Sequence, residues 1–253
     1  RAVADRDRTT LALPDGHDAL IAGVAAANDD TVVVVHAGGP VLMPWVDDVD
    51  AVVMGWYPGG EDGNVTASLL FGDTEPGGRL PITFPANDLS VPAIAPERYP
   101  GIGGVATYSE GLAVGYRFVA SGGPTPLFAF GHGLGYTTFA LDDLEAPDEV
   151  GTGDAVTVEV DITNTGERLG SHVVQVYVES PPSVGAAARQ LVGFARTTVD
   201  PGETETVTVE LDDRTFSHWD QAAGGWVTPA GLYRLHVGSS SADLPLAAEV
   251  HVG

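Results

Sequence analysis

The fold is decided by residues 31–85, which read TVVVVHAGGPVLMPWVDDVDAVVMGWYPGGEDGNVTASLLFGDTEPGGRLPITFP. Two apolar runs, residues 31–35 and 51–56, each end near a turn of glycine and proline. Neither run alternates with polar residues, which is typical of strands that helices cover on both faces. Residues 67–71 predict a short helix that ends at Gly72. The order of strand, loop and helix indicates part of a mostly parallel α/β sheet.

The loops that follow the two predicted strands, residues 36–40 and 56–64, are where we expect function. In open α/β sheets, ligands bind beyond the carboxyl ends of the strands. Asn64 in the second loop is interpreted as a helix cap. His36 is the one histidine at a strand end, and we expect it to be a satisfied core imidazole.

The composition excludes several classes of function. Acidic residues number 35 against 11 basic ones, the net charge is −24, and every basic residue is an arginine. Such a chain lacks the basic patches that nucleic acids and anionic membranes require. The absence of cysteine excludes disulfides and thiolate metal sites. No histidine stands at metal-ligand spacing with a second ligand, so we expect neither a metal nor a cofactor.

The large negative charge without lysine indicates a halophilic protein. Concentrated salt screens the repulsion between acidic side chains, while the acidic surface keeps the protein soluble. We therefore expect the chain to lose structure as KCl falls from molar concentration to about 0.1 M. The alternative is an ordinary acidic protein from a GC-rich genome.

The sequence starts at Arg1 rather than at methionine. We therefore expect further sequence to precede it, and a secretion signal is not readable from this chain. No apolar run approaches the roughly 20 residues of a membrane helix. A cytoplasmic location in a high-salt setting is the first expectation, with secretion left open.

The first part of the chain predicts an α/β domain that is joined to the next domain by a long belt. Residues 11–28 carry apolar side chains at helical spacing, and residues 85–126 lose periodicity and contain many glycines and prolines. We expect this α/β domain and its belt to cover residues 1–138. The side chains expected to anchor the belt are Tyr108, Glu110, Tyr116 and Phe118.

The second part of the chain predicts an all-β domain over residues 139–253. Apolar and polar residues alternate along it, for example at residues 156–163, where valine and isoleucine share one face. Turn signals such as Asn-Thr-Gly at 164–166 separate the runs. About seven strands in such a length indicate a β-sandwich.

Six blocks in this order resemble the C-terminal half of a glycoside hydrolase family 3 enzyme of the β-glucosidase type. They are DRTTLALP (7–14), WYPGGEDGN (56–64), LLFGD (69–73), PGGRLPITFP (76–85), YSEGLAVGYRF (108–118) and PLFAFGHGLGYTTF (126–139). The resemblance runs over nearly the whole chain. It implies the C-terminal part of the family's α/β sandwich domain, followed by an immunoglobulin-like, fibronectin type III-like β-sandwich.

By this resemblance the whole enzyme is a retaining glycosidase. One carboxylate attacks the anomeric carbon, and a second one, about 5 Å away, protonates the leaving oxygen. The nucleophilic aspartate belongs to an N-terminal barrel, in the same or a separate chain, that is absent from this sequence. In many relatives the acid/base glutamate lies a few residues before Asp7 and Arg8, where this chain has AVAD at 2–5. We therefore assign no catalytic residue in this chain: the glutamate lies upstream of Arg1 or the position is lost. Asp5 is the one candidate substitute, but its side chain is shorter, and the simpler interpretation is an exposed acid.

Three acids are candidates for binding substrate. Glu61 and Asp62 can accept hydrogen bonds from sugar hydroxyls, although acids in the first turn of a helix also stabilise it electrostatically. Glu110 lies in the belt, where it either points into the cleft or forms a salt bridge with Arg117.

Aromatic residues beside the first acids are further candidates. Trp56, together with Trp45 and Tyr57, offers ring faces on which a pyranose can stack. The alternative is that these side chains only close the core.

The sequence thus predicts the C-terminal portion of an exo-acting β-glucosidase, which hydrolyses terminal β-D-glucosyl residues of glucosides or oligosaccharides. A β-xylosidase is the alternative within the same family. A non-catalytic module that binds carbohydrate or a partner is a second class of function, and a cell-surface adhesion domain is a third. We expect this chain alone to be inactive.

Overall fold

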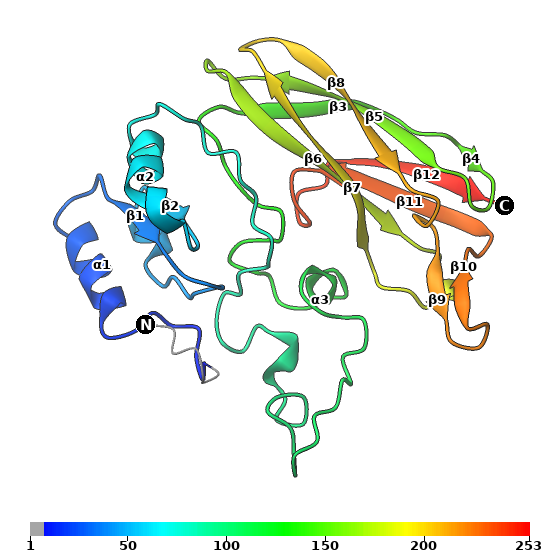
Figure 1. Ribbon diagram of the computed structural model, residues 1–253, viewed down its shortest axis with the longest axis horizontal. Helices are drawn as coiled ribbons and strands as arrows, with labels where there is room; N and C mark the ends of the chain where they lie inside the picture. The colour runs from blue at the N-terminus through cyan, green and yellow to red at the C-terminus, as the bar shows by residue number, and fades with distance from the viewer. Residues whose placement is uncertain (1–7) are drawn as a thin grey trace. The chain divides into compact units, whose positions relative to one another are not determined.

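The chain folds into two compact units (Figure 1), and the computed structural model describes residues 8–253 of it. Each unit is assembled from segments that are far apart in the sequence. The first contains the chain up to Thr74 with Ile82–Thr107 and Pro124–Phe128, and the second contains Glu75–Pro81, Tyr108–Gly123 and Ala129–Gly253. The expected domain boundary between residues 138 and 139 stays a prediction.

The first unit holds a small α/β arrangement. Its helices and strands are α1 (His17–Ala25), β1 (Val32–Val35), β2 (Ala51–Met54) and α2 (Asp62–Leu70), with 3₁₀ turns at Val46–Asp48, Gly59–Glu61 and Pro92–Ile94. β1 and β2 pair in parallel, as the valine-rich runs predict. The buried apolar side chains of this unit include Ala25, Val35, Val41, Met43, Trp45 and Phe84.

Two expectations about this unit are wrong. The strands are not covered on both faces by the described residues, since Val32 is 47% exposed and Leu20 of α1 is 64% exposed. Helix α2 begins at Asp62 rather than at residue 67, so Asn64 lies inside the helix and does not cap it. The end of α2 is as predicted, with Gly72 at φ 77° just beyond it.

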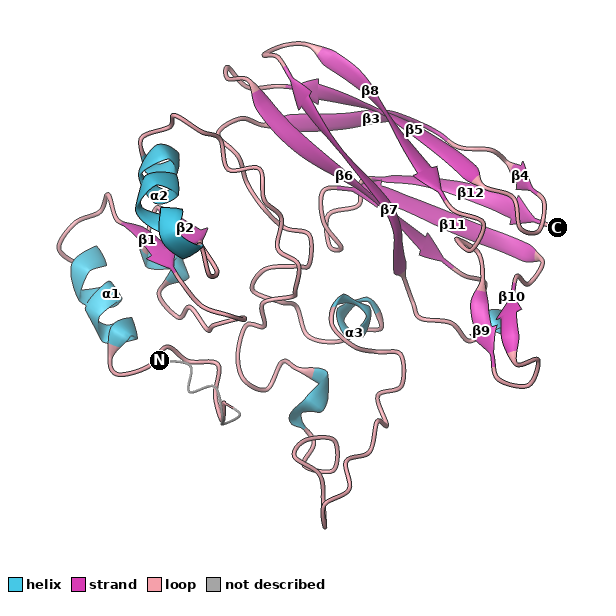
Figure 2. Ribbon diagram, in the orientation of Figure 1, coloured by secondary structure: helices cyan, strands magenta, loops and turns pink. Residues whose placement is uncertain are grey.

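The second unit is a β-sandwich (Figure 2). One sheet has the order β3 (Phe139–Glu145), β5 (Val156–Asn164), β8 (Thr204–Leu211). The other has the order β4 (Glu149–Val150), β12 (Leu246–Val252), β11 (Gly231–Gly238), β6 (Gly170–Glu179), β7 (Gln190–Val199). A separate hairpin is formed by β9 (His218–Asp220) and β10 (Gly225–Val227), and this unit also holds the short helix α3 (Tyr116–Ala120) and a 3₁₀ turn at Pro182–Val184.

The predicted alternation decides which side chains fill the sandwich. Val158, Val160 and Ile162 of β5 are fully buried, and they pack against Val176 and Leu235 of the facing sheet in one core. The side chains between them on β5 point outward. The predicted fold classes, α/β followed by a β-sandwich, are confirmed.

Both faces of β6 are buried, because residues that precede the sandwich in sequence cover its outer face. Tyr177 donates a hydrogen bond from its hydroxyl to Gln175 Oε1 at 2.7 Å. Gln175 Nε2 donates to the carbonyl oxygens of Gly131 at 3.1 Å and Ser239 at 2.5 Å. Burial raises the pKa of the Tyr177 hydroxyl well above its ordinary range, so the phenol stays a hydrogen-bond donor.

Tyr116 anchors the predicted belt to this face. Its ring stacks on Phe130 with centroids 4.8 Å apart and meets Tyr177 edge to face at 5.7 Å. Its hydroxyl accepts a hydrogen bond from the backbone N–H of Leu191 at 3.0 Å. The expected anchoring role is thus confirmed for Tyr116 and wrong for Tyr108, whose side chain is 83% exposed.

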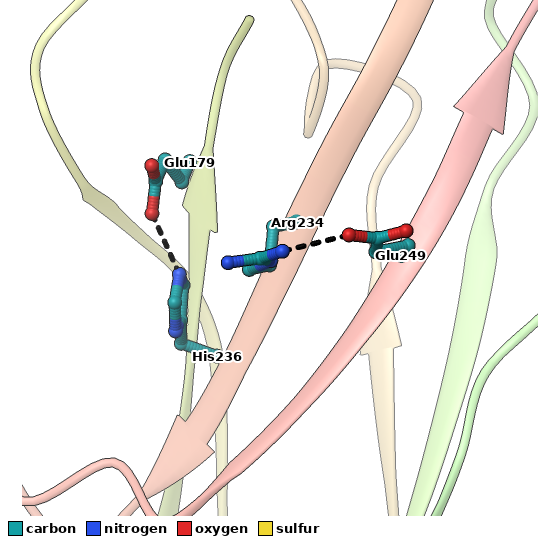
Figure 3. Close-up of polar contacts among 4 residues, drawn as sticks. All are labelled: Glu179, Arg234, His236 and Glu249. Carbon is teal, nitrogen blue, oxygen red and sulfur yellow. Dashed lines mark hydrogen bonds and ion pairs between the residues drawn. The ribbon is translucent and has the colours of Figure 1, made fainter.

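Two ion pairs link neighbouring strands of the larger sheet (Figure 3). Arg234 of β11 lies 2.7 Å from Glu249 of β12, and His236 of β11 lies 2.8 Å from Glu179 of β6. Arg234 alternates along β11 with the buried Leu235. An exposed ion pair such as that of Arg234 with Glu249 contributes only about 0–1 kcal/mol, so the apolar core dominates the stability of the sandwich.

Candidate functional site

The loops after β1 and β2 come together, as expected for neighbouring parallel strands. Val35 is opposite Met54, so His36 and Gly55 follow at adjacent strand ends. A Cβ atom at Gly55 would lie 2.5 Å from His36 Cδ2. Glycine is therefore what lets the imidazole rest against the second strand end.

His36 pairs with the first residue of α2. Its Nε2 lies 3.2 Å from Asp62 Oδ1, and Thr66 donates its hydroxyl to the same oxygen at 3.1 Å. The side chains of His36 and Asp62 are 38% and 39% exposed. The expectation of a core imidazole is therefore wrong. The convergence of two strand ends was the signal that could have linked His36 to the acidic loop.

Glu61 occupies the N-cap position of α2, next to this pair. Its Oε2 accepts a hydrogen bond from Asn64 Nδ2 at 2.6 Å, on the exposed side of the helix. A carboxylate at a helix N-terminus interacts favourably with the helix dipole by about 0.3–1 kcal/mol. The same carboxylate has lone pairs left for a hydroxyl ligand, so the site offers two neighbouring acids and one imidazole.

Trp56 has an unusual backbone conformation directly after β2. Its φ is 51°, in the left-handed region that large side chains rarely adopt, and such a conformation costs on the order of 1–3 kcal/mol. The half-buried indole meets Phe84 edge to face, with ring centroids 6.0 Å apart. Strain of this kind persists only where the surroundings enforce it, and it tends to occur at functional sites.

The other two aromatic candidates differ sharply in exposure. Trp45 is 2% exposed and donates its indole N–H to Asp18 at 2.8 Å. Of the two interpretations of Trp45, closure of the core is therefore the one that the structure supports. Tyr57 is 73% exposed, and its hydroxyl fills the space beside Gly38.

The N-terminal segment is tied to the same unit. Arg8 Nη2 donates to the carbonyl oxygen of Pro40 at 3.0 Å, in the loop after β1. Asp88 accepts hydrogen bonds from the Thr10 hydroxyl at 2.6 Å and the Leu11 N–H at 2.7 Å. These bonds, that of Thr10 first, hold the pKa of Asp88 below its usual range. Asp5 lies outside the described residues.

Glu110 belongs to the second unit. It lies in a turn in which the N–H of Gly111 donates to the carbonyl oxygen of Tyr108 at 3.0 Å, and its side chain is half-buried. The structure thus joins His36 to Asp62 with Glu61 beside them at the start of α2, while Trp56 precedes Glu61 in the same loop and contacts Phe84. The part of Glu110 in the site stays a prediction.

Residues 8–253 also bear on two other classes of site, a membrane-spanning helix and a metal site. Over that range, no helix combines the length and the apolar character needed to cross a bilayer. Within the same residues, no three His, Asp or Glu side chains are grouped so that they could hold a metal ion.

Family models match both parts of the chain. The model described as the glycosyl hydrolase family 3 C-terminal domain matches residues 2–136. The model described as a fibronectin type III-like domain matches residues 172–241.

Among curated proteins, a β-glucosidase of Rhizobium radiobacter is 43% identical over 97% of this chain, and a probable β-glucosidase I of Aspergillus terreus is 38% identical over 94%. The chain spans only 30% and 29% of the length of these two relatives. The residues that correspond to most of their length are therefore not in this chain.

Solved structures of β-glucosidases are also similar to this chain. DesR, a β-glucosidase from Streptomyces venezuelae in complex with D-glucose, superposes with a TM-score of 0.92 at 42% identity, over 98% of this chain and 32% of that one. β-Glucosidase 3B from Thermotoga neapolitana, in complex with α-D-glucose, has a TM-score of 0.86 at 33% identity, over 96% and 34% of the two chains. With the family model covering more than half of its length, the chain belongs to the glycosyl hydrolase family 3 C-terminal domain family.

Proposed function

We propose that the whole protein is a retaining, exo-acting β-glucosidase and that this chain supplies one wall of its active site. The observation that carries the proposal is the similarity to β-glucosidases over nearly all of this chain, including the loops after β1 and β2. Two of the similar structures hold glucose. The substrate is accordingly a β-glucoside or a β-linked oligosaccharide with a terminal glucosyl unit.

In this proposal the two catalytic carboxylates are about 5 Å apart, and at least the nucleophile lies outside this chain. The nucleophilic aspartate comes from an N-terminal barrel, in the same or a separate polypeptide. Exposed apolar side chains of the first unit support such a partner, because a soluble protein rarely leaves so many uncovered. They include Leu20, Val24, Val32, Val65, Leu70 and Phe71.

The residues of this chain bind and orient the sugar. Trp56 stacks on the pyranose ring, and the carboxylates of Glu61 and Asp62 accept hydrogen bonds from its hydroxyls. His36 fixes the orientation of Asp62 through their 3.2 Å contact. Glu110 is a further candidate acceptor.

Two measurements on the protein isolated from its source test this function. The first is its intact mass, which we expect to exceed 26.1 kDa greatly. The second is the hydrolysis of p-nitrophenyl β-D-glucopyranoside against the β-D-xylopyranoside. Faster hydrolysis of the glucoside supports the proposal, and faster hydrolysis of the xyloside favours the β-xylosidase.

A native mass of 26.1 kDa would favour the second class of function, a module that binds carbohydrate or a partner. Mixing the chain with a separately expressed barrel then decides between two cases. Restored hydrolysis indicates an enzyme split over two polypeptides. Absence of hydrolysis in that mixture leaves the non-catalytic module.

Glu61→Gln and Asp62→Asn in the whole enzyme are each expected to lower kcat/KM for the aryl glucoside about tenfold, because each removes a charge-assisted hydrogen bond to substrate. The matched control is Asp73→Asn, an exposed acid just beyond the other end of α2. It should leave kcat/KM unchanged. Unchanged kcat/KM in Glu61→Gln and Asp62→Asn would leave these acids only their helix-stabilising role.

We also propose that the protein is adapted to concentrated salt, as the net charge of −24 and the absence of lysine suggest. Circular dichroism between molar and about 0.1 M KCl checks this, since the Debye length grows as salt is removed. We expect the signal of folded structure to fall at low salt. A spectrum that stays constant over the whole range would contradict the adaptation.

A further inference from the structure

The hairpin of β9 and β10 presents two tryptophans at the surface of the β-sandwich unit. Trp219 and Trp226 are directly opposite each other in the antiparallel register, so their side chains lie on the same face of the hairpin. They are 54% and 52% exposed, whereas Trp45 is 2% exposed. Figure 2 shows the hairpin as a two-stranded ribbon separate from the two main sheets.

The exposed indoles are not needed to close the core beneath them. The sandwich core already contains Phe216, just before β9, and Tyr233, with ring centroids 5.0 Å apart and exposures of 5% and 0%. The two ends of the hairpin are joined by a hydrogen bond of 2.7 Å between the hydroxyls of Ser217 and Thr228. Two half-exposed tryptophans therefore form apolar surface that the folded unit leaves in water.

Charged groups surround this apolar surface. The Arg214 guanidinium lies over the ring of Trp226, 5.3 Å from its centroid. Asp220 Oδ1 accepts hydrogen bonds from the N–H groups of Ala222 at 2.7 Å and Ala223 at 2.9 Å, which fixes the carboxylate beside the turn. The arrangement combines apolar ring surface with a guanidinium donor over one indole and a carboxylate acceptor beside the turn.

We propose that Trp219 and Trp226 form a second carbohydrate subsite, which binds one neutral β-glucosyl unit away from the loops after β1 and β2. A pyranose has the matching chemistry, since its C–H face stacks on an aromatic ring while its hydroxyls reach polar groups at the rim. Asp212, Asp213 and Asp220 outnumber Arg214 near the rim, so an anionic sugar is disfavoured. The choice of a glucosyl unit rests on the proposed function.

The ring geometry limits what binds. The two indoles meet at 86° with centroids 6.0 Å apart, so their faces do not form one plane. One sugar ring at a time stacks there, and such a small contact gives a Kd of about 1 mM. The subsite therefore holds a chain end loosely rather than anchoring a polysaccharide tightly.

The experiment is a ¹⁹F NMR titration of the full chain, in which its four tryptophans carry 5-fluorotryptophan. Each resonance is assigned by a tryptophan-to-phenylalanine substitution. We expect cellotetraose, added to about 10 mM, to shift the Trp219 and Trp226 resonances saturably. The resonance of the buried Trp45 should stay in place.

Substitutions on the hairpin make the test specific. Trp219→Ala is expected to weaken the affinity seen at Trp226 at least tenfold, and Trp219→Phe, which keeps a ring, should weaken it less. The matched control is Phe194→Ala on β7, an aromatic side chain that is 68% exposed in the same unit. It should leave the affinity unchanged.

Three results would overturn the subsite: no saturable shift at Trp219 and Trp226, equal affinity in Trp219→Ala, or shifts that follow protein concentration without sugar. The last would make the hairpin a protein interface. Hydrolysis by the whole protein is measured separately. Hydrolysis without a shift of the tryptophan resonances contradicts the subsite alone. A saturable shift without hydrolysis supports the subsite and contradicts the proposed function.

Discussion

Replacing Asn164 by alanine lowers the free energy of unfolding of the β-sandwich unit by about 3–5 kcal/mol. Asn164 is fully buried at the end of β5. Its Nδ2 donates to the carbonyl oxygens of Val199 at 2.8 Å and Arg168 at 2.7 Å. Its Oδ1 accepts from the Thr137 hydroxyl at 2.6 Å and the Gly166 N–H at 3.1 Å.

The effect is large because alanine lacks the donor and the acceptor of the side-chain amide. The buried backbone groups that the amide pairs with are then left without a hydrogen bond. Each such group costs about 1–3 kcal/mol, more than the net gain of an ordinary hydrogen bond. The Val199 carbonyl is the clearest case, since that residue is 1% exposed.

Urea denaturation, followed by circular dichroism, measures this loss. The matched control is Thr163→Ala, the preceding residue on β5, whose exposed hydroxyl lies 2.8 Å from that of Thr204. Water replaces that bond, so the control should change the unfolding free energy by less than about 0.5 kcal/mol. Equal losses in the two variants would show that burial of the amide is not what stabilises the turn.

The second large effect is a loss of stability in acid that depends on His172. This imidazole of β6 is 5% exposed and packs against Phe139, with ring centroids 5.0 Å apart. Burial first, and the positive charge of Arg79 second, lower the pKa of His172 from 6.5 to about 4, partly opposed by Asp243. The folded state thus holds the ring neutral where the unfolded chain protonates it.

The stability that depends on neutral His172 is complete above pH 6.5 and is lost as the pH falls to about 4. In this window the unfolded chain binds more protons, so the free energy of unfolding falls by about 3 kcal/mol as the solution is acidified. His132, whose pKa is also lowered by burial and by Arg79, adds to the fall in the same direction.

His172→Gln should flatten most of this slope in urea titrations between pH 4 and 7. Val173→Ala, a non-titrating neighbour on β6, is the control and should shift the whole curve without changing its slope. A variant at His172 that keeps the full slope would place the acid sensitivity elsewhere.

The β-sandwich could be predicted because strands such as β5 and β8 bury one face. Val158, Val160 and Ile162 stand two apart, and period-two burial leaves that pattern in the sequence directly. The alternation of valines along β6 is also visible in the sequence, but the burial of its outer face at Gln175 and Tyr177 could not be predicted, because residues from elsewhere in the chain cover it. The local sequence pattern of a strand does not show that distant segments of the chain bury its outer face.

The candidate site could be predicted only in part. The strand ends pointed to the two loops, and the structure confirms that these loops meet. The start of α2 was missed because Gly59, Gly60 and Gly63 lower the helix propensity of that stretch, and tertiary contacts override it. The pairing of His36 with Asp62 joins residues 26 positions apart; the converging strand ends point to the two loops but not to this particular contact.

The interleaving of the two units bears on how the protein is made. The chain passes between them five times, after residues 74, 81, 107, 123 and 128. A ribosome synthesises the chain from its N-terminus, so the first unit cannot be completed until Phe128 has been made and pairs with Phe84. Glu75 is made early, but its carboxylate can accept the hydrogen bond from the N–H of Ser171 only after that residue has been synthesised. Neither unit can therefore complete its folding before much of the other has been synthesised. Nascent chains remain incompletely folded, and need protection from aggregation, until the sandwich strands emerge.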